Sequence, residues 1–85
     1  MDVKRGTVVK SLHGRDSGYF LIVTGFDGGR ILVADGRERP LERPKQKNIR
    51  HIEITEDVLP EAALRGNRAL KKALAAYTRS QSEVK

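Results

Sequence analysis

The fold is decided by the stretch Gly6-Thr7-Val8-Val9-Lys10-Ser11-Leu12-His13-Gly14-Arg15-Asp16-Ser17-Gly18-Tyr19-Phe20-Leu21-Ile22-Val23. Two runs rich in β-branched and aromatic residues flank a five-residue connection, Gly14–Gly18, which has the composition of a longer hairpin loop. Its end glycines allow positive φ, and Asp16 and Ser17 can hydrogen-bond to nearby amides. The stretch predicts antiparallel strands at about residues 5–12 and 19–26, with Arg15 exposed at the loop tip.

The next segment continues the sheet. Asp27-Gly28-Gly29 is a tight-turn signal, and it precedes an expected third strand at Arg30–Ala34. The consecutive apolar residues Leu21-Ile22-Val23 require burial on both faces of their strand, which is typical of a small barrel and not of a one-sided sheet. Phe20 and Phe26 are also expected to lie in the core.

A polar segment, residues 37–47, comes before the last strand. Because its two prolines cannot donate to a ladder, it is expected to form only a short edge strand near Leu41 within an extended loop. The fifth strand is expected at Asn48–Ile54, where the irregular spacing of isoleucines predicts a bulge near Arg50. The sequence therefore predicts a mainly β fold, a small five-stranded SH3-like barrel over residues 1–58.

One or two short helices are expected after the barrel, in an extension spanning residues 59–80. The pattern predicts a short helix at about residues 59–65 and a second at about 68–79, capped by Asn67. The second helix carries one apolar stripe that should cover the barrel: Leu70, Ala73, Leu74 and Tyr77. A lesser basic face lies away from that stripe: Arg68, Lys72 and Arg79. Residues 81–85 are expected to be a flexible tail.

The charge of the chain is strongly basic and unevenly distributed. Its 85 residues include 17 Lys and Arg against 11 Asp and Glu, a net charge of +6, and this balance favours polyanionic partners. Residues 37–50 carry six basic and two acidic side chains, so this stretch supplies the whole net charge of +4 of residues 1–54. We therefore expect a basic patch along the edge strand and its loop.

The sequence lacks the residues that several classes of protein require. There are no cysteines, and two histidines without a carboxylate cluster do not indicate zinc. Gly14–Gly18 lacks the lysine and the spacing of a phosphate-binding P-loop. The sequence also shows no pairing of a nucleophile with a base that would indicate an enzyme. No apolar run approaches the roughly 18 residues of a membrane span. We expect a cytoplasmic protein, monomeric when free, without a cofactor, a metal or a small-molecule substrate.

Two segments resemble one known family. Val8 and Val9, Gly14-Arg15-Asp16, Gly18 and the apolar run through Val23 resemble the KOW motif of ribosomal proteins and transcription elongation factors. Lys47-Asn48-Ile49-Arg50-His51-Ile52-Glu53 looks like the closing strand of the large-subunit ribosomal proteins of archaeal and eukaryotic type and their small bacterial relatives. The resemblance covers about residues 3–58. The C-terminal tail is similar only in being helical. The resemblance implies an SH3-like barrel that binds ribosomal RNA.

RNA binding requires cations that neutralise phosphates, and donors or flat surfaces for bases and sugars. The candidate cations come from the edge segment and from two hairpin tips: Arg37, Arg39, Arg43, Lys45, Lys47, Arg50, Arg15 and Arg30. The other candidate RNA-binding residues are His13, Asn48 and His51. Strict alternation would place Asn48 and His51 on opposite sides of their strand.

Each of these assignments has a structural alternative. The cations can form a merely solubilising edge, and Arg15 can be an ordinary exposed loop arginine. Asn48 can tie down a turn, and the two histidines can pack within the protein. Of four aromatic residues only Tyr19 is a candidate stacking platform, which favours recognition of folded RNA by its backbone and shape.

The charge pattern predicts a non-enzymatic RNA-binding protein, and the family resemblance implies that it is ribosome-associated and binds structured RNA of the large ribosomal subunit. An alternative from another class is an SH3-like protein-interaction module of a transcription or translation complex. In that case the strand edge and the helix stripe would hold a polypeptide, and binding would tolerate salt better than RNA binding does.

Overall fold

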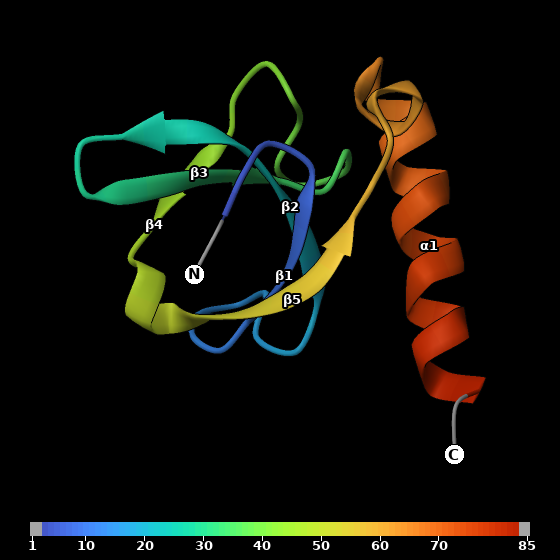
Figure 1. The fold of residues 1–85 in the computed structure, drawn as a ribbon, viewed down its shortest axis with the longest axis horizontal. Helices are drawn as coiled ribbons and strands as arrows, with labels where there is room; N and C mark the ends of the chain where they lie inside the picture. The colour runs from blue at the N-terminus through green and yellow to red at the C-terminus, as the bar shows by residue number, and fades with distance from the viewer. Residues whose placement is uncertain (1–2, 84–85) are drawn as a thin grey trace.

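A computed structural model describes residues 3–83 and contains a five-stranded antiparallel sheet with one long helix beside it (Figure 1). The strands are β1 (Thr7–Ser11), β2 (Phe20–Asp27), β3 (Arg30–Ala34), β4 (Lys45–Lys47) and β5 (Ile52–Val58). Two 3-10 turns, η1 (Ile49–His51) and η2 (Glu61–Leu64), and the helix α1 (Asn67–Glu83) complete the chain. The strand order is β4-β3-β2-β1-β5. The predicted mainly β fold with a C-terminal helix is confirmed.

β2 is buried on both faces, as its apolar run predicts, because each face meets a different cluster. One cluster joins the strands to η2 and α1: Val8, Ile22, Ala34, Ala63, Leu64, Leu70 and Leu74. The predicted helix stripe therefore covers the sheet. The other cluster lies on the opposite face: Val9, Leu21, Val23, Ile31, Val33 and Ile52.

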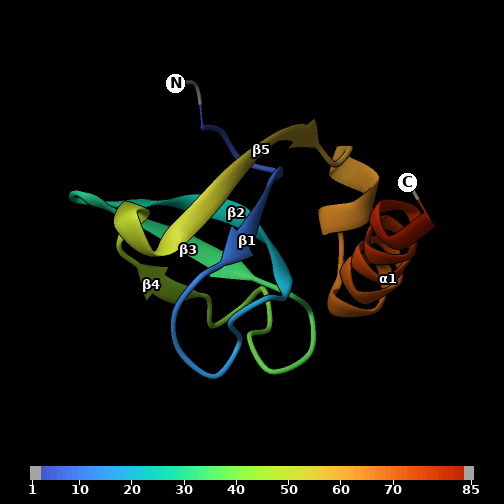
Figure 2. The same ribbon diagram turned by 90° about the horizontal axis from the view of Figure 1, so that it is seen from below.

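The second cluster is enclosed by the curvature of the sheet itself (Figure 2). Ile31 in β3 and Ile52 in β5 share this cluster although β2 and β1 lie between their strands. β4 and β5 are the two edges of the sheet, yet only residues 48–51 connect them, and three of these form the compact turn η1. The edges therefore lie close together. No ladder joins β4 to β5 within residues 3–83, so the sheet is curled but not closed into a barrel.

The connection between β1 and β2 is longer than predicted. It runs from Leu12 to Tyr19 and is closed by a hydrogen bond in which Gly18 N donates to Ser11 O (2.7 Å). Gly14 and Gly18 have φ values of +90° and +91°, so the loop uses its glycines as the sequence indicates.

The edge strand lies at residues 45–47 and not near Leu41. Leu41 N donates to Asn67 Oδ1 (2.7 Å), and the Leu41 side chain packs against the cluster under the helix. The backbone of Leu41 is thus held by the helix and not by a strand. β4 pairs with β3 through Ile31↔Lys47 and Val33↔Lys45, so the edge is charged as expected but begins only after the second proline.

β5 begins at Ile52, four residues later than predicted. Asn48 is the N-cap of η1, and its side chain accepts a hydrogen bond from Arg50 N (2.9 Å). Of the two roles left open for Asn48, the structure shows that it ties down a turn. The predicted bulge near Arg50 is wrong, because a 3-10 turn accounts for the isoleucine spacing. The irregularity in the β1–β5 ladder falls instead between Thr7 and Val9.

The helical extension differs from the prediction at both ends. Its first helix is only the 3-10 turn η2, and α1 continues to Glu83, so residues 81–83 belong to the helix and not to a tail. Residues 84–85 of the predicted tail lie outside the described residues. Asn67 does not cap α1 with its side chain. Besides accepting from Leu41 N, the side chain donates to Glu42 Oε1 (2.8 Å) and thereby joins the helix to the 35–44 loop.

The aromatic side chains are placed partly as expected. Tyr77 anchors α1, since its ring meets Phe20 edge-to-face with 5.0 Å between centroids and its hydroxyl donates to Asp57 Oδ2 (2.6 Å). The expectation that Phe26 lies in the core is wrong, because its side chain is 54% exposed near the end of β2.

Candidate nucleic-acid interface

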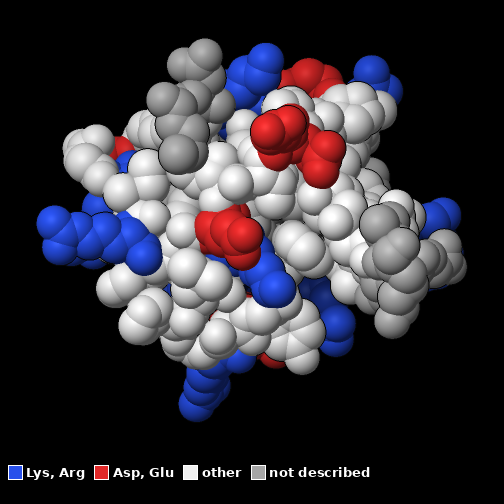
Figure 3. Space-filling model, turned by 60° about the horizontal axis from the view of Figure 1, so that its bottom comes forward, with Lys and Arg blue, Asp and Glu red and all other residues white. Residues whose placement is uncertain are grey.

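The predicted site residues do not form one continuous patch. On the face drawn in Figure 3, most Lys and Arg side chains lie apart from one another toward the outline, and those nearer the middle lie beside acidic groups. Two grooves collect most of the candidates, one on each side of the β1–β2 loop. The arginine groove, about 440 Å³, is lined by Arg15, Asp16, Tyr19, Asp35, Arg37, Glu38 and Arg39. The histidine groove, about 270 Å³, is lined by His13, Gly14, Arg30, Lys45, Gln46, Lys47, Asn48 and His51.

The two histidines meet in the histidine groove because the β1–β5 ladder extends beyond the strands. The ladder pairs Ser11 with Ile52, and the next hydrogen bond runs from Leu12 N to His51 O (2.9 Å). His13 consequently lies beside His51, with 4.4 Å between ring centroids and 32° between ring planes. Both residues are exposed, so the two tilted rings form a small aromatic surface open to solvent.

The charged side chains that line the histidine groove are all basic. Arg30 reaches it from the β2–β3 turn and Lys45 from β4, and among the described residues no Asp or Glu lines it. Asp27 lies beside the groove, since it is the ladder partner of Arg30 and its Oδ2 accepts a hydrogen bond from the Gln46 amide (2.6 Å). Its carboxylate offsets part of the positive charge, and the cations of the lining still favour an anion.

Lys47 is the one predicted phosphate ligand that the fold withdraws from solvent. Its side chain is 5% exposed, and Nζ donates to Ser11 Oγ (2.9 Å), His13 O (2.8 Å) and Asp16 Oδ1 (3.1 Å). An ammonium has three protons, so all of its donors are used. Lys47 thus fixes the loop that carries His13, and it has no donor left for a phosphate.

Asp16 is the charged partner in this arrangement. Burial acts to raise the pKa of its carboxyl, but hydrogen bonds from Ser11 (2.7 Å) and Lys47, together with the lysine charges, outweigh burial and hold the pKa below its ordinary value of 3.8. Its Oδ2 atom is buried and has no hydrogen-bond partner among the described residues. The carboxylate is therefore held ionised beside Lys47.

The arginine groove is larger but electrostatically mixed. Its three arginines share the lining with three carboxyl side chains, so their formal charges cancel. Asp35 has a turn-forming role, because its Oδ1 accepts hydrogen bonds from Arg37 N (2.8 Å) and Arg39 N (3.0 Å). Tyr19 is 68% exposed here and is available for stacking. This groove attracts an anion less strongly than the histidine groove does.

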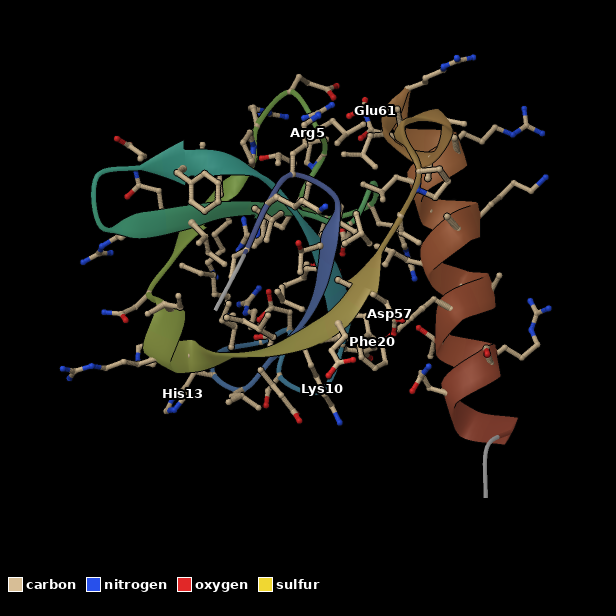
Figure 4. All side chains as sticks on the ribbon, viewed as in Figure 1. Arg5, Lys10, His13, Phe20, Asp57 and Glu61 are labelled. Carbon is tan, nitrogen blue, oxygen red and sulfur yellow. The ribbon has the colours of Figure 1, made fainter. Side chains whose placement is uncertain are left out.

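Some of the basic residues outside the predicted site have protein partners. Arg5 pairs with Glu61 (3.2 Å), and Lys10 Nζ lies 5.9 Å from the centroid of the Phe20 ring (Figure 4). Within residues 3–83, the ion pairs are Arg5–Glu61 and Lys47–Asp16. The other cations of both grooves therefore have no described carboxylate partner, and Arg43 and Arg50 line neither groove.

Sequence reasoning missed the Lys47–Asp16 pair and the contact between the two histidine rings. The lysine and the aspartate are 31 residues apart, and no local pattern marks either as a partner of the other. Asn48 and His51, expected on opposite sides of a strand, line one groove because a 3-10 turn replaces the alternation of a strand.

Compared with profiles of known protein families and with curated protein sequences, the chain matches none. Among the described residues, no helix combines the length and the apolar character that a membrane crossing requires. The same residues contain no cluster of three His, Asp or Glu side chains placed to hold a metal ion.

Proposed function

We propose that this chain is a non-enzymatic RNA-binding protein that holds folded RNA at the histidine groove. The observation that carries the proposal is the tilted ring pair His13–His51, open to solvent beside Arg30 and Lys45 in a groove that no acidic residue among those described lines. Cations and a flat aromatic surface are the two features that RNA recognition combines.

Each part of the groove has a distinct task in this proposal. Arg30 and Lys45 neutralise phosphates, and the imidazole rings offer a face or ring nitrogens to a base or ribose. Arg15 and Tyr19 lie on the other side of the same loop and extend the contact into the arginine groove. Lys47 does not contact the RNA in this proposal. It holds the backbone of His13 in place through its hydrogen bond to His13 O.

The curled sheet supports the finer assignment, an SH3-like barrel of the KOW type that binds ribosomal RNA of the large subunit in the cytoplasm. Its edges are joined by only four residues, as expected for strands that nearly close on themselves. Recognition of RNA backbone and shape agrees with the small number of aromatic residues, two Phe and two Tyr in 85 residues, since sequence-specific binding of single strands depends on stacking.

The test is binding to ribosomal RNA fragments and to a plain RNA duplex over a series of salt concentrations. For about four to six phosphate contacts, log affinity should fall against log salt with a slope of roughly −3 to −5. The double variant Arg30→Gln/Lys45→Gln should reduce the size of this slope by about 1.4 to 1.8, since each lost phosphate contact removes about 0.7 to 0.9.

The matched control is Arg37→Gln/Arg39→Gln, which removes the same formal charge from the arginine groove. We expect a smaller loss of affinity there, because carboxylates already offset its arginines. Equal effects of the two double variants would contradict the histidine groove as the main site. A wild-type slope near zero would contradict RNA binding and favour the protein-interaction module.

A further inference from the structure

The outer side of the helical extension is a second basic surface. It is separate from the histidine groove, whereas the arginine groove comes closer to α1, because Gly36, between the lining residues Asp35 and Arg37, packs against Asn67 and Lys71. Residues 65–81 contain no Asp or Glu but five exposed cations: Arg65, Arg68, Lys71, Lys72 and Arg79. Figure 4 shows side chains with nitrogen ends extending from α1 away from the sheet, while His13 lies at the other end of the molecule. We call these five residues the helix face.

The arrangement of these charges opposes the stability of the helix. Lys71 and Lys72 lie three and four residues after Arg68, and like-charge pairs at these spacings destabilise a helix. The first turn of α1 has no acidic residue and its last turn has no basic one, which is the reverse of what the helix dipole favours. A face selected only for solubility would mix both signs of charge.

The helix face is also held rigidly. Leu70 is fully buried, Leu74 is nearly so, and Tyr77 is fixed by Phe20 and Asp57. At the other end, the Asn67 side chain binds the 35–44 loop through two hydrogen bonds. Arg68 and Arg79 are therefore presented along about 16 Å of one fixed helix.

We propose that the helix face binds the phosphate backbone of a second RNA segment, so that one protein molecule bridges two segments of a folded RNA. This inference rests on the proposed binding of RNA at the histidine groove. Charge complementarity selects the occupant, because five cations without a carboxylate suit a polyanion. In Figure 4, His13 of the histidine groove lies at the end of the molecule opposite α1, so an RNA segment held at that groove is separate from one that lies along the helix face.

The experiment uses two identical RNA duplexes, one with a donor and one with an acceptor dye, mixed with the full chain at substoichiometric protein. Wild-type protein should bring the dyes together. The variant Arg68→Gln/Lys72→Gln/Arg79→Gln should still bind one duplex but lose this energy transfer. The slope of its log affinity against log salt should become smaller in size by about 2 to 3. Glutamine keeps the helix propensity, so thermal stability should not decrease.

The control Arg68→Lys/Arg79→Lys keeps the charges and should retain energy transfer. Two results would overturn the bridging proposal but not RNA binding at the groove. One is undiminished energy transfer in the glutamine variant, and the other is wild-type protein that binds only one duplex. If Arg30→Gln/Lys45→Gln has no effect on binding while the helix variant abolishes it, the proposed groove function fails, and bridging fails with it. If wild-type protein binds neither duplex, both proposals fail.

Discussion

Replacing Lys47 by Met removes a buried charge whose three donors all have partners. Methionine fills much of the volume of the lysine stem, so the main loss is electrostatic. Asp16 keeps only its hydrogen bond from Ser11 in a largely enclosed site. Breaking a buried pair costs about 3–5 kcal/mol, and since the Asp16 side chain is 18% exposed, water can partly replace the lysine. We therefore expect a loss of about 3 kcal/mol in the free energy of unfolding.

That loss is large for a chain of this size, whose total stability should be about 4–13 kcal/mol. Urea unfolding measures it directly. With a slope near 1 kcal/mol per molar urea, the midpoint should fall by about 3 M, and the melting temperature by about 12–24 °C. Lys45→Met, two residues earlier in the same strand, should change stability by less than about 0.5 kcal/mol. A loss below about 1 kcal/mol for Lys47→Met would refute the structural role of this lysine.

The pH dependence of stability tests the Lys47–Asp16 pair in a second way. Because the folded protein holds the pKa of Asp16 below 3.8, the stabilisation is present above that pH and is lost as the pH falls through the lowered pKa. Wild-type stability should decrease below about pH 4, and the Asp16→Asn variant should show a smaller decrease. Equal acid dependence in the two proteins would show that Asp16 is not held ionised by its neighbours.

Two further predictions concern the helix. Gly36→Ala should lower stability by at least about 1 kcal/mol in urea unfolding, because Gly36 has a φ of +82° and an added Cβ would overlap Asn67 O, whereas Gly29→Ala, with nothing within 4 Å, is its control. Tyr77→Phe should cost about 1 kcal/mol by removing the hydrogen bond to Asp57. Burial and Asp57 raise the pKa of Tyr77 above 10.0, so its stabilisation is present below pH 10 and is lost as the pH rises through the raised pKa. In an absorbance titration, the wild-type protein should show a contribution of Tyr77 to tyrosinate formation above pH 10, and this variant should lose that contribution while it keeps the signal of Tyr19.

Local patterns in the sequence predicted the elements whose formation depends on neighbouring residues. The hairpin loop, the double burial of Leu21-Ile22-Val23 and the stripe of α1 follow from turn chemistry and from the periods of strand and helix. The edge strand was misplaced because Leu41 packs under the helix and bonds to Asn67, a contact between residues 26 positions apart. Phe26 was misplaced because hydrophobicity alone does not say where a strand leaves the core.

The sequence by itself determined a small basic β domain with a covering helix, and it identified most of the side chains that form the two grooves. Only the tertiary structure decided which of those side chains act together. His13 meets His51, and Lys47 turns inward to Asp16, because strand register and sheet curvature bring residues more than 30 positions apart into contact. Register and curvature follow from how the whole core packs, and no short stretch of sequence contains that information.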